Sequence, residues 1–332
     1  MPAASVLEKL NPYLVLVRER YGKAPQPSTE KVGTLSKEWA EKLGLKESIV
    51  ISGSSFDAHA GAVGAGIAEK TFVCTMGTSC VDMFVEKAEN LKGKNIQSYC
   101  GQAENSILPG YVGVETGQAA FGDIFAWFKR LLEWPLNQLS QIRESDISEE
   151  LYIKVKDQIL LMLQEEAERL PDEPFPVALD WFNGRRYPNT DDAQKSAIVG
   201  LSLGMDAPYL YRSLVFGAVC GLYRLIEGFE KQQINIEKII AVGGISKKSP
   251  YVMQMLSDLS NREICILDSD QTCAQGAAMY AAVAAGIYEN LETAAGYMAA
   301  KCIKTYKPNS EKKEWYRKHY QENLNLAEAV NT

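Results

Sequence analysis

The sequence of 332 residues lacks the features that mark several specialised classes of protein. It has no uninterrupted apolar run of the length of a membrane span, and its amino terminus lacks the basic-then-apolar order of a signal peptide. Its formal net charge of -7 argues against a general basic surface for nucleic acid. With a hydrophobic content of 46%, which is enough for a large core, the chain is predicted to be a globular cytoplasmic protein with no membrane or nucleic-acid partner.

Cysteine and histidine do not form metal-binding patterns. The seven cysteines are an odd set without a C-x-x-C pair, and several lie in apolar runs such as TFVCTM and GAVCGLY. We therefore expect buried thiols in a reducing compartment, with no zinc or other metal site and no disulfide framework. Of the two histidines, we expect His59 to be satisfied locally and His319 to lie on the surface of a charged carboxy-terminal segment.

The order of apolar patterns predicts an α/β domain. TFVCTMGTS and CVDMFVE read as two strands joined by a Gly-Thr-Ser turn, and NSILPGYVGVETG reads as a further strand pair that turns at Pro109-Gly110. From residue 177 onward, strands alternate with helices, which favours a largely parallel central sheet with an antiparallel part. Residues 1–47 read as short helices and loops, with Ser36 as an N-cap and Gly44 as a C-cap.

Two glycine-containing turns are candidates for binding an anion. MGTS, residues 76–79, offers backbone amides and two hydroxyls between two apolar strands, although it also fits an ordinary hairpin turn. In IIAVGGISKKSP, an apolar strand runs into Gly243 and Gly244 before a helix begins at Ser249-Pro250. Glycines at this edge of a parallel sheet allow close approach of a ligand, but they also suit a tight strand–helix turn.

Three polar positions carry alternative interpretations. Asp57, in SGSSFDAHAGAVGAGI, fits either a helix start or a base that accepts a proton from a hydroxyl. Glu115 and Gln118 either hydrogen-bond a polyol or cap the helix that follows. The two arginines of DWFNGRRY either form surface ion pairs or clamp a phosphate or carboxylate.

Taken in order, these stretches resemble the carboxy-terminal half of the FGGY family of carbohydrate kinases, from about residue 6 to about residue 295. The stretches GVETGQAAFGDIFAWFK and LDWFNGRR bring the chain nearer to the ribulokinases than to the xylulokinases or glycerol kinases. The resemblance implies a ribonuclease-H-like lobe of the actin/hexokinase type, with a mixed central sheet flanked by helices. It also implies a sugar kinase that uses ATP and Mg²⁺ to convert L-ribulose to L-ribulose 5-phosphate.

The resemblance further implies roles for individual residues. Asp57 matches the family's catalytic base, and Glu115 matches a position that contacts sugar hydroxyls. Gly77, Thr78 and Ser79 match the turn at the transferring phosphates. Gly243, Gly244 and Lys247 match positions beside the nucleotide.

The resemblance also predicts a division of the chain. Residues 1–47 correspond to the end of the family's amino-terminal lobe, residues 48–305 to the nucleotide-binding lobe, and residues 306–332 to a charged helical tail. Because most sugar contacts of the family lie in the amino-terminal lobe, we expect little or no activity from this chain alone. Self-association, or a partner that supplies the missing lobe, is a further expectation. Kinase action on another pentulose, such as xylulose, and a non-catalytic nucleotide-binding or oligomerisation module are the alternatives.

Overall fold

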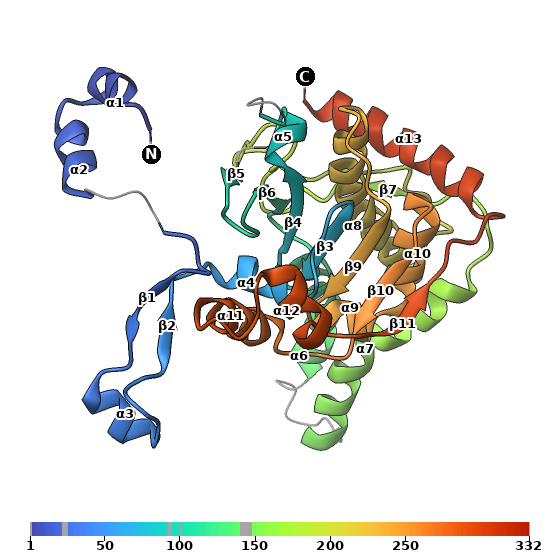
Figure 1. Ribbon diagram of the computed structural model, residues 1–332. Helices are drawn as coiled ribbons and strands as arrows, with labels where there is room; N and C mark the ends of the chain where they lie inside the picture. Colours follow the sequence, from blue (N-terminus) through green and yellow to red (C-terminus); the bar gives the residue numbers. More distant parts are fainter. Residues whose placement is uncertain (1, 22–25, 92–94, 100, 140–147, 332) are drawn as a thin grey trace.

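A computed structural model describes residues 2–21, 26–91, 95–99, 101–139 and 148–331 of the chain (Figure 1). Its central sheet contains β3 (Thr71–Met76), β4 (Cys80–Lys87), β5 (Gly101–Glu104), β6 (Tyr111–Gln118), β9 (Lys238–Val242), β10 (Ile264–Leu267) and β11 (Cys302–Tyr306). The strand order is β11-β10-β9-β3-β4-β6-β5. β3, β9 and β10 run parallel, whereas β4, β5, β6 and β11 pair antiparallel with their neighbours. The α/β class with a mixed sheet is thus confirmed.

One face of the sheet is covered by α4 (Asp57–Gly64), α11 (Thr272–Ala284) and α12 (Leu291–Met298) (Figure 1). Small residues let α4 and α11 approach closely, since a Cβ at Gly64 would lie 2.0 Å from the carbonyl oxygen of Thr272. Alternate strand residues such as Val73, Met83 and Ile240 point to this side. The Ala- and Gly-rich sequences of both helices are therefore explained by packing of backbone against backbone.

The other face is covered by longer helices with larger side chains. Its core joins Cys74, Met76 and Phe84 from the strands to the almost completely buried helix α8. The helices on this side, with the short α9 at the strand ends, are α6 (Gly122–Leu139), α7 (Glu149–Arg169), α8 (Ala207–Glu230), α9 (Gly244–Lys248), α10 (Pro250–Ser260) and α13 (Lys313–Val330). A short two-stranded ladder of β7 (Val177–Ala178) and β8 (Ile198–Val199) lies beside α8 and α13, where longer strands were predicted.

The carboxy-terminal helix α13 corrects the prediction for His319. That side chain is only 2% exposed, because its ring stacks on Phe175 with 4.7 Å between centroids and also contacts Trp315. Its Nδ1 lies 2.9 Å from the carbonyl oxygen of Trp315. The charged residues of this segment therefore occupy only one side of a helix whose aromatic side packs on the body.

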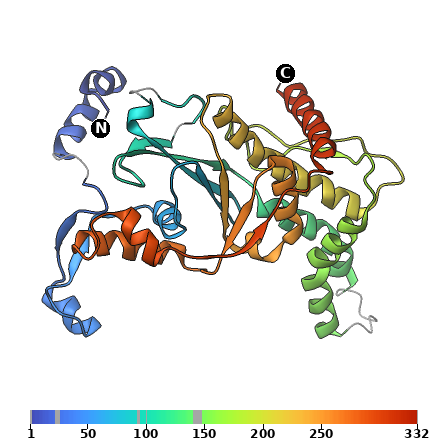
Figure 2. The same ribbon diagram turned by 45° about the vertical axis from the view of Figure 1, so that its right-hand side comes forward.

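The first part of the chain forms an arm that projects from the body in both views (Figures 1 and 2). The arm contains α1 (Ala4–Leu10), α2 (Tyr13–Tyr21), β1 (Lys31–Thr34), α3 (Lys37–Leu43) and β2 (Val50–Ser52). α3 begins and ends as predicted, since Ser36 Oγ accepts a hydrogen bond from the Trp39 amide and Gly44 adopts a φ of 65°. Because β2 pairs antiparallel with β1, the arm extends to Ser52.

The hairpin predicted to turn at Pro109-Gly110 is formed by different residues from those predicted. Residues 105–110 form the loop of the hairpin, and its first strand is the preceding segment β5. The side-chain amide oxygen of Asn105 accepts a hydrogen bond from the Gly110 amide across this loop. The apolar residues Ile107 and Leu108 are buried below it as part of the α4 side of the core, which explains their strand-like composition. The short α5 (Ala88–Leu91) follows β4.

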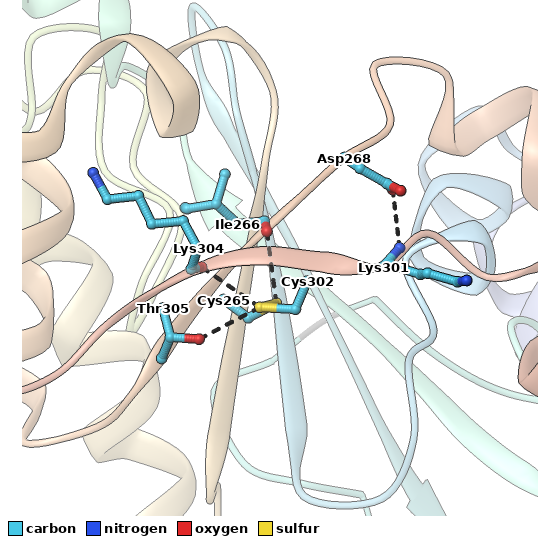
Figure 3. The surroundings of a disulfide bond; sticks show 7 residues. All are labelled: Cys265, Ile266, Asp268, Lys301, Cys302, Lys304 and Thr305. Carbon is cyan, nitrogen blue, oxygen red and sulfur yellow. Dashed lines mark hydrogen bonds between the residues drawn. A yellow bond between two sulfur atoms is a disulfide. The ribbon is translucent and has the colours of Figure 1, made fainter.

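The cysteines are only partly as predicted. Cys74, Cys80 and Cys220 are buried free thiols, whereas Cys273 is exposed, and Cys100 lies outside the described residues. Cys265 and Cys302 form a disulfide between the neighbouring strands β10 and β11 (Figure 3). The expectation of thiols alone is therefore wrong, because antiparallel pairing brings two cysteines that are 37 residues apart in sequence to adjacent strands. In the described part of the chain, no helix is long and apolar enough to span a membrane.

Candidate active site

The Gly77–Ser79 turn connects β3 to β4 and is held by the start of α6. The Phe121 amide donates to the Thr78 carbonyl oxygen at 2.8 Å, and the Gly122 amide donates to the Gly77 carbonyl oxygen at 3.0 Å. The hydroxyls of Thr78 and Ser79 make no hydrogen bond to the described residues, and Gly77 and Thr78 are exposed. The turn therefore has a fixed backbone and two hydroxyls that are available to a ligand.

The glycine pair lies immediately beside this turn. β3 and β9 are parallel neighbours with Thr75 opposite Val242, so the residues that follow the two strands emerge at the same edge of the sheet. Gly243 adopts a φ of 91°, and a Cβ at this position would lie 2.5 Å from the carbonyl oxygen of Met76. At Gly244, the first residue of α9, a Cβ would meet nothing within 4 Å. The sheet topology thus brings together both candidate anion-binding turns at the carboxyl ends of two parallel strands, where open α/β sheets bind ligands.

Lys247 lies one turn further along the short helix α9. Its Nζ is 2.5 Å from Asp270 Oδ1, in the loop between β10 and α11. Asp268 in the same loop hydrogen-bonds the backbone of Lys301 near the disulfide (Figure 3). Lys247 is therefore near the glycine pair but already has an anionic partner.

Asp57 is the first residue of α4. Phe56 is the N-cap and makes no side-chain capping bond, while Asp57 Oδ1 accepts a hydrogen bond from the adjacent Ala58 amide at 2.8 Å. The Asp57 side chain is exposed. The helix start thus fixes the carboxylate in position with little of its hydrogen-bonding capacity in use, an arrangement compatible with accepting a proton.

Glu115 on β6 is connected to the Asp57 helix through His59. His59 Nε2 lies 3.3 Å from Glu115 Oε2, and His59 Nδ1 lies 3.1 Å from the carbonyl oxygen of Ser106. His59 is 8% exposed, whereas the carboxylate of Glu115 is exposed. The prediction of a locally satisfied histidine is confirmed, and its partner is the residue predicted to contact a polyol.

A cavity of about 420 Å³ lies between Glu115 and the phosphate-binding turn candidate. The polar side chains that line it include Ser79, Ser98, Glu115, Gln118, Arg186 and Thr190. Gln118 does not cap α6; its Nε2 donates to Asp180 Oδ2 at 2.7 Å and to the Ala218 carbonyl oxygen at 3.0 Å. No sequence pattern indicated Thr190 or Ser98, because both reach the cavity through loops whose path depends on the tertiary fold.

The two arginines of DWFNGRRY have different environments. Arg185 Nε donates to the Asn189 carbonyl oxygen at 3.0 Å, and its guanidinium lies over the Trp181 ring at 5.3 Å. Arg186 lines the cavity and forms an ion pair with Asp192 at 3.5 Å, with both side chains at least half exposed. Arg185 thus stabilises the loop, while Arg186 remains available to a ligand.

A family model described as "FGGY family of carbohydrate kinases, C-terminal domain" matches residues 72–285. This match runs from β3 to the end of α11, so it includes both glycine turns and Glu115 but not the edge strand β11. The chain belongs to the FGGY family of carbohydrate kinases. Membership identifies it as part of a sugar kinase and implies the use of ATP.

Several curated relatives are ribulokinases. The chain is 40% identical to the ribulokinase of Vibrio parahaemolyticus over 310 residues, which are 93% of this chain and 54% of the relative. It is 34% identical to the ribulokinase of Geobacillus thermodenitrificans over 331 residues, which are 98% of this chain and 56% of the relative. The chain therefore spans about half the length of these relatives.

Solved structures of sugar kinases share the fold. A xylulose kinase from Rhodospirillum rubrum aligns with a TM-score of 0.74 at 18% identity, covering 92% of this chain and 57% of that one. A Plasmodium falciparum glycerol kinase, solved with ADP, aligns with a TM-score of 0.68 at 16% identity, covering 91% of this chain and 55% of that one. At these identities, the structures support the fold class predicted from the sequence.

The residues at the sheet edge fit ATP, the nucleotide whose use the family implies. The open space at Gly244 suits the close approach of a phosphate chain, and so do the hydroxyls of Thr78 and Ser79, which have no hydrogen-bond partner among the described residues. No cluster of three or more acidic, histidine or cysteine side chains that could hold a metal occurs among the described residues.

Proposed function

We propose that this chain is the nucleotide-binding part of a kinase that transfers the γ-phosphoryl group of MgATP to L-ribulose, giving L-ribulose 5-phosphate and ADP. The observation that carries the nucleotide assignment is the juxtaposition of the Gly77–Ser79 turn with Gly243 and Gly244 at one sheet edge. The choice of L-ribulose is supported by the similarity to ribulokinases at 34–40% identity. Cytoplasmic localisation and a role in L-arabinose breakdown follow from this proposal.

Phosphoryl transfer requires positioning and charge stabilisation more than covalent chemistry from the protein. Asp57 accepts the proton of the sugar's terminal hydroxyl while the hydroxyl oxygen forms a bond to the γ-phosphorus of ATP. The bond between the γ-phosphorus and the oxygen that bridges it to the β-phosphorus breaks, and ADP leaves with that oxygen. The backbone and hydroxyls of Gly77, Thr78 and Ser79 hold the transferring phosphate. Gly243, Gly244 and Lys247 lie beside the nucleotide, and Glu115 accepts hydrogen bonds from sugar hydroxyls. Mg²⁺ bound with the nucleotide would supply positive charge to the phosphates.

The division of the chain at residues 47/48 and 305/306 is part of the same proposal. The arm exposes large apolar side chains, including Leu10 at 72% and Tyr21 at 71% exposure. We propose that these side chains pack against the remaining kinase lobe or against a second copy of the chain. Turnover depends on that lobe, so a binding measurement is the more discriminating first test on this chain.

Isothermal titration calorimetry with ATP, with and without Mg²⁺, tests the nucleotide assignment. We expect saturable binding that strengthens with Mg²⁺ and is unchanged in Asp57→Asn, because the base acts on the hydroxyl and not on the nucleotide. Absence of binding would remove the nucleotide assignment and favour an oligomerisation module.

A phosphorylation assay then tests the chemistry and the choice of sugar. ADP release is measured with L-ribulose and with xylulose, using the chain alone and the chain mixed with a complementary amino-terminal lobe of a ribulokinase. Activity that requires the added lobe and is lost in Asp57→Asn supports the proposal. A preference for xylulose would favour the alternative pentulose kinase.

A further inference from the structure

A further cavity, of about 400 Å³, lies beside α10, on the side of the body that also carries α7 and α13 (Figure 1). Among the described residues, this α10 cavity shares no lining residue with the cavity between Ser79 and Glu115. Its volume is in the range of small-molecule sites. Its lining combines charged side chains with aromatic rings, including those of Tyr251, Trp315 and Tyr316. The α10 cavity is therefore a separate candidate for binding a ligand.

The two cations that line the α10 cavity already have partners. Arg212 is buried, and its guanidinium donates to backbone carbonyl oxygens at the end of α7, at distances of 2.7 and 2.8 Å. Lys312 forms an ion pair with Asp172, and its Nζ lies 5.8 Å from the centroid of the Trp315 ring. Both positive charges thus stabilise the fold, which disfavours an anionic ligand.

Two carboxylates of the lining, by contrast, have no ion-pair partner in the described part of the chain. Asp258 is only 4% exposed, and its Oδ1 accepts hydrogen bonds from Gln254 Nε2 at 2.7 Å and from the Asn309 amide at 2.8 Å. Its Oδ2 has no donor among the described residues. Glu168 on α7 is exposed and likewise lacks an ion-pair partner. A buried carboxylate with one unsatisfied oxygen favours a positively charged donor.

The rings and a hydroxyl near Asp258 suit the remainder of such a ligand. Tyr316 is 8% exposed, and its hydroxyl makes no hydrogen bond to the described residues. That oxygen can accept a hydrogen bond from an ammonium group. The rings of Tyr251 and Tyr316 supply π systems, which attract cations and pack against methylene groups. The lining therefore offers unpaired negative charge and aromatic surface together.

We propose that the α10 cavity binds an aliphatic diamine or polyamine, with one ammonium group paired with Asp258 and another with Glu168. The methylene groups between them pack against the rings of Tyr251 and Tyr316. The pair at Asp258 is the stronger one, because that carboxylate is buried whereas the carboxylate of Glu168 is exposed to solvent. This inference goes beyond the proposed kinase reaction, and none of these groups belongs to the candidate active site.

Calorimetric titration of the full chain with putrescine tests this assignment. The companion probes are n-butylamine, which has the same number of carbon atoms and one positive charge, and butanediol, which has none. We expect saturable binding of putrescine, weaker binding of n-butylamine and no binding of butanediol. Asp258→Asn should weaken putrescine binding about tenfold or more, because the amide oxygen still accepts from Gln254 and Asn309 but carries no charge. Glu168→Gln should weaken it about threefold, as expected for an exposed pair.

A matched control separates the cavity from general attraction of cations to an acidic protein. Glu166→Gln removes an equal charge from an exposed position of α7 outside the cavity, so its putrescine affinity should equal that of the unmodified chain. Circular dichroism checks that each variant is folded. If Asp258→Asn does not fold, the comparison of Glu168→Gln with Glu166→Gln decides the outcome.

Three results would overturn the proposal. The first is no putrescine binding to the unmodified chain. The second is an equal putrescine affinity in the unmodified chain and the cavity variants, or an equal loss in Glu168→Gln and Glu166→Gln. The third is butanediol binding as tight as that of putrescine, which would assign the α10 cavity to polyols. No nucleotide takes part in these titrations, so their failure would leave the kinase assignment unchanged, and a failure of MgATP to bind would leave the diamine assignment unchanged.

Discussion

His59 Nε2 lies 3.3 Å from Glu115 Oε2, which links the helix that begins with Asp57 to the middle of strand β6. The other ring nitrogen faces the carbonyl oxygen of Ser106 at 3.1 Å. Both partners of the imidazole are oxygen atoms that accept hydrogen bonds. The candidate base and the candidate polyol contact are thus positioned by one buried side chain.

Replacement of this histidine should therefore reduce stability and remove the contact that holds the Glu115 side chain in position. We expect His59→Ala to lower the free energy of unfolding by about 1–3 kcal/mol, because it removes two hydrogen bonds of a buried side chain. Urea denaturation of His59→Ala, Glu115→Ala and the double variant gives the coupling energy of the pair, expected at about 0.5–1.5 kcal/mol. A coupling energy near zero would show that the two side chains act independently.

Substitutions at Gly243 and Gly244 should have different effects on stability and on nucleotide binding. Gly243→Ala should destabilise the protein by about 2 kcal/mol or more, because its φ is 91° and the new Cβ would lie 2.5 Å from the Met76 carbonyl oxygen. Gly244→Ala should leave the thermal midpoint nearly unchanged, since a Cβ at that position meets nothing within 4 Å.

The Gly244→Ala substitution should affect nucleotide affinity instead of stability. If a phosphate chain approaches Gly244 closely, then Gly244→Ala weakens MgATP binding by about tenfold although the protein remains stable. Calorimetry and differential scanning fluorimetry on the same samples measure both effects. Unchanged MgATP affinity in a folded Gly244→Ala protein would place the nucleotide elsewhere.

Local features were predictable from the sequence where one short segment contains the physical cause. The Ser36 cap, the αL residue Gly44 and the start of α4 at Asp57 each depend on neighbours within one helical turn. The alternation of strands and helices after residue 177 likewise predicted parallel strands, and β9 and β10 pair in this way.

Features that depend on distant partners were not predictable in this way. β5 has the composition GQAE, without a strand pattern, and becomes a strand because its backbone pairs with β6. His319 is buried by Phe175, which is far away in sequence, and Arg186 reaches the cavity only through the folded loop. In each case, the local sequence is compatible with exposure and the tertiary contact decides the outcome.

The Cys265–Cys302 disulfide should contribute to stability in an oxidised sample. It closes a loop of 37 residues, for which chain-entropy estimates give about 3–4 kcal/mol. We expect Cys302→Ser, or treatment with a reducing agent, to lower the thermal midpoint. Cys273→Ser is the control, because that thiol is free and exposed. An equal midpoint with and without reductant, with all thiols titratable in the unfolded chain, would show that the bond does not form.

The buried carboxyl group of Asp82 should make stability depend on pH. Burial within β4, between the buried thiols of Cys74 and Cys80, raises the pKa of Asp82 to about 7 from its usual 3.8. Between these two values the folded chain holds a proton that the unfolded chain has released, so the free energy of unfolding falls as the pH rises. Each pH unit in this window costs about 1.4 kcal/mol, and the loss is complete above about pH 7.

Asp82→Asn isolates this contribution, because the amide is uncharged at every pH. We expect the unmodified chain to be more stable near pH 5 than near pH 8, and the variant to show a flatter profile across this window. Relative to the unmodified chain, Asp82→Asn should therefore gain stability as the pH rises from 5 to 8. Urea denaturation at intervals of half a pH unit measures both profiles. Parallel profiles would show that Asp82 does not titrate between the two values, and that other groups set the pH dependence of the fold.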